Sequence, residues 1–140
     1  MDRTAWQKMA NRWLKDAKRL LDGKRWAAAY HVMGYALEFG LKACLIRHVG
    51  TKPEIILEDR KLSDKAWTHS LADLVKLAEM ETDRAAHAAA NPGFEKNWGT
   101  ALDWNEKSRY GQKDHREAKK LFKAITDKKD GVVTWIKDRW

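Results

Sequence analysis

Arg109 and His115, separated by five residues, are the two side chains of this sequence best suited to cleaving a phosphodiester. That reaction needs a proton donor or acceptor that works near neutral pH and a cation that stabilises charge on the phosphoryl oxygens. Histidine and arginine supply these two roles. Six positions along one continuous helix would place the two side chains about 240° apart. The pair can therefore converge only if a helix begins between them, which Gly111 and the polar residues after it predict.

The sequence around the pair leaves two interpretations open. Asp114 is a suitable N-cap, which would place His115 in the first turn of the last helix, where the helix dipole disfavours the protonated imidazole. Arg25 and His31 have the same spacing inside an expected helix, so spacing alone does not identify a site. In the alternative interpretation, Arg109 binds a carboxylate or caps a helix, and His115 is an exposed helix residue.

A second chemical feature is a carboxylate within an apolar segment, residues 35–45, which read Y-A-L-E-F-G-L-K-A-C-L. Glu38 precedes Lys42 by four positions, the order that favours a helical ion pair, worth about 0.2 to 0.5 kcal/mol when exposed. A buried Glu38 would instead orient Arg109. The sequence does not decide between these roles.

Several familiar catalytic devices are absent from the sequence. It has no glycine-rich loop for phosphates or dinucleotides, no paired-histidine zinc motif and no serine-hydrolase motif. His69 and Asp73 share a helix face, but no second pair of possible metal ligands is evident. We therefore expect neither a metal nor another cofactor.

Apolar residues at helical spacing predict the elements that must position these groups. A first helix runs from Trp6 to near Gly23, where glycine can adopt the left-handed cap conformation. A second begins at Trp26 and stops at Gly50 and Pro53. A third opens at residues 68–70 and closes at residues 91–93, a short one covers residues 94–104, and one long helix, with residues 130–131 as the place for a kink, ends the chain.

The fold class follows from these patterns. No segment alternates apolar and polar residues with period two, so we expect an all-α, up-and-down bundle of four or five helices in a single domain, residues 1–140. Gly34 and Gly40, each costing about 1 kcal/mol inside a helix, predict close approach of a neighbouring element. Cys44 is the only cysteine, and no segment resembles a signal peptide or a membrane span, which predicts a soluble, cytoplasmic protein.

The net charge of +8 is concentrated at both ends of the chain, whereas residues 51–106 carry more acidic than basic residues. If the first and last helices are neighbours, the basic ends form one surface suited to a polyanion such as RNA. The residues expected to contact a nucleic acid are Lys8, Arg12, Lys113, Arg116 and Lys120. The alternative is an ordinary solvated face rich in lysine.

Eight tryptophans are many for 140 residues. Base stacking is one use for them, but packing accounts better for Trp6, Trp13, Trp26 and Trp135, which lie at or beside expected core positions. Trp98 and Trp104, in a less regular segment, are the two that we expect at a dimer interface or a ligand.

Four segments together resemble the HEPN superfamily over nearly the whole chain. They are the basic first helix, the Y-A-L-E-x-x-L-K-A-x-L pattern of residues 35–45, the H-x-L-x-x-L pattern that begins at His69, and the R-x5-H pattern before the last helix. The resemblance implies a helical bundle, usually a homodimer. Many members are metal-independent endoribonucleases whose R-x(4–6)-H motifs face each other across the dimer.

Carried over to this chain, the resemblance gives the R-x5-H pair a role in RNA cleavage. Arg109 would bind the scissile phosphate, and His115 would assist its transfer to the neighbouring 2′-hydroxyl, which leaves a cyclic phosphate. The supporting residues would be Glu38, Tyr110 and Asp114.

Two departures from the family pattern bear on activity. Active members commonly have asparagine, aspartate or histidine where this chain has Tyr110. Glu117 occupies the place of a tyrosine typical of toxins paired with a nucleotidyltransferase, which disfavours that toxin–antitoxin role. Whether the chain is an enzyme therefore stays open. The alternative is a non-catalytic HEPN-like module that binds nucleotide, RNA or a protein partner encoded nearby, and a purely structural helical dimer is a third hypothesis.

Overall fold

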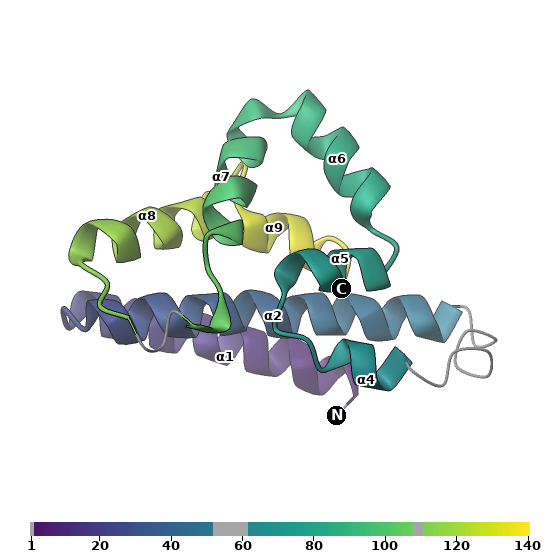
Figure 1. Ribbon diagram of the computed structural model, residues 1–140, viewed down its shortest axis with the longest axis horizontal. Coiled ribbons are helices and arrows are strands. Elements are labelled where there is room, and N and C mark those ends of the chain that lie inside the picture. The colour runs from purple at the N-terminus through teal and green to yellow at the C-terminus, as the bar shows by residue number, and fades with distance from the viewer. Residues whose placement is uncertain (1, 52–61, 108–110) are drawn as a thin grey trace.

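The computed structural model describes residues 2–51, 62–107 and 111–140, which form eight helices and no strand (Figure 1). The helices are α1 (Arg3–Asp22), α2 (Trp26–Thr51), α4 (Leu62–Ala66), α5 (Leu71–Leu77), α6 (Glu81–Ala90), α7 (Pro92–Leu102), α8 (His115–Thr126) and α9 (Val132–Lys137). The all-α class expected from the sequence is thereby confirmed. α1 and α2 lie side by side and antiparallel at the base of Figure 1, and α5 to α9 lie above them.

α1 is amphipathic, as its sequence predicts. Asp2 caps it by accepting a hydrogen bond from a backbone N–H of the first turn, and the apolar side of the helix packs on α2. The helix ends at Asp22, close to the expected position. The left-handed residue of the turn that follows is Lys24 (φ 60°), however, and not Gly23 (φ −81°), so the prediction of a left-handed glycine cap is wrong.

α2 is the central helix, because α1, α5, α8 and α9 all contact it. Its buried apolar residues include Met33, Leu37, Leu41 and Cys44. At two glycines of α2, the absence of a side chain lets a bulky residue from another element approach the helix closely. A Cβ at Gly34 would lie 1.8 Å from Trp104 Cε2, and one at Gly40 would lie 2.9 Å from Ile136 Cγ2. The close approach predicted at both glycines is confirmed.

The third expected helix is divided into α5 and α6. The break lies at residues 78–80, where Glu79 adopts a left-handed conformation (φ 55°) and Met80 N donates a hydrogen bond to Val75 O at 2.9 Å. This bond and the left-handed residue form a Schellman motif, which usually contains glycine at that position. The apolar spacing of the sequence gives no sign of this break.

The long final helix expected from the sequence is also divided, into α8 and α9. Asp127 Oδ1 accepts hydrogen bonds from Lys129 N at 3.0 Å and from Asp130 N at 2.7 Å, which forms a turn in place of a helical turn. Gly131 after it is extended (ψ 142°). The apolar spacing continues through the break because both helices contact α2.

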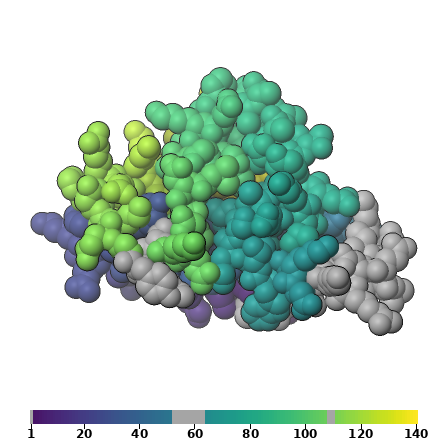
Figure 2. Space-filling model, viewed as in Figure 1, coloured from purple at the N-terminus to yellow at the C-terminus, as the bar shows by residue number. Residues whose placement is uncertain are grey.

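α7 and residues 103–107 bring the chain back onto α2. Phe94 and Trp98 anchor α7 in the core against Trp135 of α9, with ring centroids 5.6 and 6.0 Å away. Figure 2 shows α7 descending between α8 on one side and α5 on the other. Trp98 is thus a core residue, and its expected place at an interface or ligand is wrong. Trp104 is also buried, but it lines a pocket described below.

Replacing Gly34 by alanine tests the contact between α2 and Trp104. The added Cβ would meet the indole at 1.8 to 2.2 Å, so Trp104 would have to leave its buried position. We expect the free energy of unfolding, measured with urea, to fall by about 3 kcal/mol. Gly99→Ala in α7 is the control, because nothing lies within 4 Å of its added Cβ and alanine favours a helix by about 1 kcal/mol. Equal unfolding midpoints for the two variants would contradict the contact.

Candidate functional site

Glu38 is the most deeply buried charged group among the described residues, with 1% of its surface exposed. Lys42 Nζ lies 2.8 Å from its Oε1, and His69 Nδ1 lies 3.0 Å from Oε1 and 3.1 Å from Oε2. An isolated carboxylate in an apolar interior costs several kcal/mol, and the two donors offset that cost. The helical ion pair suggested by the sequence is therefore present, but it is buried.

Lys42 is itself only 7% exposed, because two indoles cover its ammonium group. Nζ lies 5.3 Å from the ring centroid of Trp6 in α1 and 5.8 Å from that of Trp67, which follows α4. Trp67 is 75% exposed. Attraction between the cation and the two ring faces thus adds to the ion pair with Glu38.

His69 links this buried pair to the surface. Its side chain is 38% exposed, and its second ring nitrogen, Nε2, lies 3.5 Å from Oε1 of Glu106. The turn before α5 fixes the residue, because Thr68 Oγ1 accepts a hydrogen bond from Ser70 N at 3.0 Å and Ser70 in turn caps α5. The ring also meets Tyr35 edge to face at 5.9 Å. His69 thus connects α2, the start of α5 and the segment after α7.

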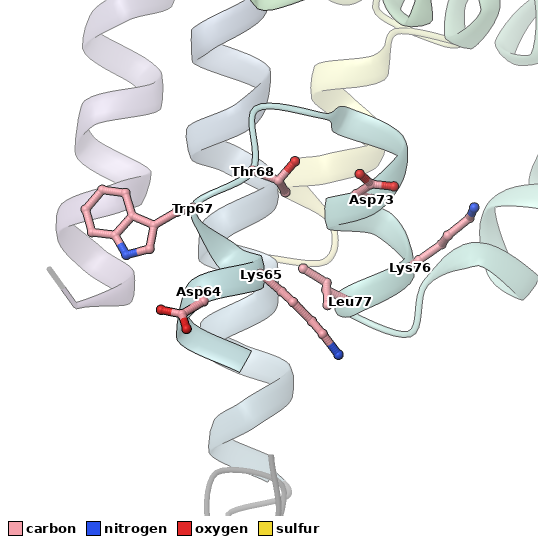
Figure 3. A pocket seen from close by; sticks show the side chains of 7 residues that line it. All are labelled: Asp64, Lys65, Trp67, Thr68, Asp73, Lys76 and Leu77. Carbon is pink, nitrogen blue, oxygen red and sulfur yellow. The ribbon is translucent and has the colours of Figure 1, made fainter. Parts of the chain in front are cut away.

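Two pockets lie near this network. The first opens between the start of α5 and the segment after α7, and its lining includes His69, Ser70, Leu102, Trp104, Glu106 and Lys107. The second lies between α4 and α5 and is lined by Asp64, Lys65, Trp67, Thr68, Asp73, Lys76 and Leu77 (Figure 3). Each lining has as many carboxylates as lysines, so charge does not separate the two pockets, but only the first includes His69 and Glu106. The pocket beside His69 is therefore the better candidate.

The described residues on either side of 108–110 contact successive turns of α2. The contacts are Trp104 with Tyr35 (5.3 Å between centroids), Lys113 Nζ with the Tyr30 ring (4.8 Å) and His115 with Trp26 (5.7 Å between centroids). Nine positions separate Trp26 from Tyr35, which is about 13.5 Å along a helix. Because His69 also meets Tyr35, the two histidines lie beside different parts of α2.

α8 begins at His115, as the sequence predicts. Asp114 is its N-cap, and its Oδ1 accepts a hydrogen bond from Glu117 N at 2.9 Å. Residues 111–114 are not helical, so no continuous helix joins the two residues of the R-x5-H pattern, and His115 is exposed. Arg109 and Tyr110 lie outside the described residues, so their roles stay predictions.

The predicted nucleic-acid contacts on α1 and α8 form two separate groups. Exposed on α8 are Arg116 and Lys120, and exposed on α1 are Lys8 and Arg12. α1 approaches α8 through Lys18, whose Nζ lies 5.8 Å from an aromatic ring of α8. Arg12 and Lys8 lie about 9 and 15 Å farther along α1. The structure thus brings the α8 group to His115, but not the α1 group.

Lys113 differs from the other predicted contacts because it is already paired. Its Nζ lies 3.1 Å from Glu117 Oε2, and this hydrogen bond is the main cause that raises the pKa of Lys113. Burial raises the pKa of the Tyr30 hydroxyl, and the nearby Lys113 opposes that shift. Lys113 and Glu117 therefore both have a structural role at the start of α8.

Residues 4–56 match the family model of the HEPN domain. The resemblance inferred from the sequence is thereby confirmed. The matched stretch contains Glu38 and Lys42, whereas His69, Glu106 and His115 lie after it. No curated protein and no solved structure matches the chain. The HEPN match supports a module related to nucleotide or RNA.

The described part of the chain offers no group of three histidine, cysteine or carboxylate side chains that could hold a metal ion. His69 faces two glutamates that come from other elements. Among the same residues, no helix is both long and apolar enough to cross a membrane.

The sequence alone did not reveal what His69 and Glu106 do in this chain. The spacing of His69 and Asp73 suggests only half of a metal site, and Glu106 belongs to no motif. The available signal is that Glu38 and His69 both lie in HEPN-like patterns. Neither pattern shows that the two side chains meet.

Lys42→Met tests the buried pair by removing one partner of Glu38. We expect the free energy of unfolding in urea to fall by about 3 to 5 kcal/mol, because a buried charge loses its partner. Lys18→Met is a matched control, since Lys18 pairs with Asp22 at the same spacing and at 2.7 Å, but on the surface. The control should lose less than about 1 kcal/mol. Similar losses in the two variants would refute a special contribution from burial.

Proposed function

We propose that the chain is a metal-independent HEPN endoribonuclease that acts as a homodimer. The observation that best supports this is the start of α8. His115 is the first residue of that helix, it is exposed, and residues 111–114 before it are not helical. Arg109 and His115 are therefore not held on different faces of one helix.

The chemistry of the proposed reaction divides between the two residues. A neutral imidazole of His115 at the N-terminus of α8 can accept the proton of an RNA 2′-hydroxyl. The O2′–P bond then forms and the P–O5′ bond breaks, and the leaving O5′ takes up a proton from water, which leaves a 2′,3′-cyclic phosphate and a 5′-hydroxyl. Arg109 would pair with the phosphoryl oxygens, and Arg116 and Lys120 on the exposed side of α8 would contact neighbouring phosphates.

A half-buried aromatic cluster supports the homodimer. It contains Trp6 and Trp13 of α1 and Tyr35 and Phe39 of α2, with ring centroids 5.0 to 6.2 Å apart. Partly exposed aromatic clusters are typical of protein interfaces. This one adjoins Lys42, which Trp6 covers. A second copy bound there would lie next to the Glu38 network.

Incubating the protein with a labelled structured RNA in EDTA tests the nuclease. We expect the wild type to produce cyclic-phosphate ends, and His115→Ala and Arg109→Ala each to slow cleavage by about 100-fold or more. Arg3→Ala is the control, because Arg3 is also an exposed arginine but lies at the opposite end of α1 from α8. The control should cleave like the wild type.

RNA that is bound but not cut would reject the nuclease and favour the non-catalytic module. Tyr110, which departs from the pattern of active members, is the sequence feature on the side of that alternative. Filter binding of the same RNA, with and without Arg116→Ala and Lys120→Ala, separates binding from cleavage. Binding should weaken and lose part of its salt dependence in these variants.

Light scattering of the purified protein tests the homodimer. We expect a mass near twice 16.3 kDa for the wild type and near 16.3 kDa for Phe39→Asp, which places a charge within the aromatic cluster. Circular dichroism should show that the variant keeps its helices. A wild-type mass near 16.3 kDa at concentrations used for the nuclease assay would eliminate the dimer.

A further inference from the structure

We propose that His69 is a positioning residue, which together with Glu38 and Glu106 holds the segment leading into Arg109 against α2. These three residues are called the His69 bridge below. Its effect on catalysis rests on the proposed nuclease function. The bridge itself rests only on contacts between described residues.

The geometry of the bridge places a carboxylate at each ring nitrogen of His69. Nδ1 lies 3.0 and 3.1 Å from the two carboxylate oxygens of Glu38, and Nε2 lies 3.5 Å from Glu106 Oε1. A carboxylate accepts hydrogen bonds and donates none, whereas an imidazolium donates from both nitrogens. His69 can therefore join a fixed carboxylate of α2 to a carboxylate on the segment after α7.

The partners of the bridge are held to different degrees. Glu38 is fixed, because it is buried in the middle of α2 and also binds Lys42. Glu106 is about one third exposed and lies outside the helices that form the core. The bridge consequently fixes the segment that carries Glu106 relative to α2.

Positioning accounts for these contacts better than direct catalysis. Each ring nitrogen of His69 faces a carboxylate, and two carboxylates disfavour a phosphate at the same place. Lys42, the cation that shares Glu38 with His69, is buried between Trp6 and Trp67. His69 is therefore assigned to act through another residue and not on the RNA.

The residue through which it would act is Arg109. Glu106 precedes Arg109 by three positions, and Trp104 just before it packs into the space left by Gly34. On the other side of residues 108–110, Lys113 lies over Tyr30 and Asp114 caps α8. The described residues before and after 108–110 thus contact α2, and His69 supplies a polar contact on the arginine side.

Kinetics can show whether His69 acts through Arg109. We expect His69→Ala to lower kcat for RNA cleavage by about 10- to 100-fold, the range that a displacement of about 1 Å can cause, with little change in KM. His69→Gln, which keeps one donor, should recover part of the loss. In an Arg109→Lys background, His69→Ala should cause little further loss, because the arginine to be positioned is absent. Fully independent losses would overturn the assignment.

Hydrogen exchange measured without RNA tests the bridge apart from any activity. In His69→Gln and in Glu106→Gln, the amides of residues 103–107 should exchange faster, while those of α1 and α8 keep the wild-type rate. Lys76→Ala is the control. Lys76 is exposed on α5, on the other side of the second pocket from Trp67, and its side chain points away from Trp67 (Figure 3). Unchanged exchange at 103–107 in both bridge variants would refute the bridge, whatever the nuclease assay shows. A wild type that leaves RNA uncut while exchange increases would reject only the nuclease.

Discussion

A carboxylate buried in the middle of α2 constrains how the rest of the structure can pack. Ionised Glu38 is tolerated in an apolar interior only if donors reach it from more than one direction. Lys42 comes from the next turn of the same helix, but His69 lies 31 positions after Glu38 in the sequence. α5 must therefore dock on α2 in the register that brings the imidazole to the carboxylate. Apolar contacts supply most of the favourable free energy, while the charge selects the arrangement.

The same helix also determines where the last third of the chain can lie. Gly34 leaves room on α2 for an indole, and Trp104 fills it. From there the described contacts with α2 pass toward its start, through Tyr30 to Trp26. The groups that could act on a ligand are thus held by one rigid element, although they come from three distant parts of the sequence. Rigid support of this kind is what a precise site needs.

Periodicity predicts the helices well, because burial against α2 forces apolar residues to recur every three or four positions. It does not predict where helices break. Lys24 and Glu79 take the left-handed positions of two helix ends, so the usual glycine signal is missing at both. At the site, local chemistry was predictable, as with the cap formed by Asp114. The meeting of Glu38, His69 and Glu106 was not, since it depends on how three separate elements pack.

Of the described helices, the HEPN match covers α1 and α2, and this division has a physical counterpart. The matched part contains the buried pair of Glu38 and Lys42, which every later element must accommodate. His69, which completes the contacts of Glu38, and His115 both belong to the part beyond the match. A scaffold that keeps α2 can therefore alter the surrounding groups, so the activity of such a chain has to be argued from the residues docked on α2 and not from α2 itself.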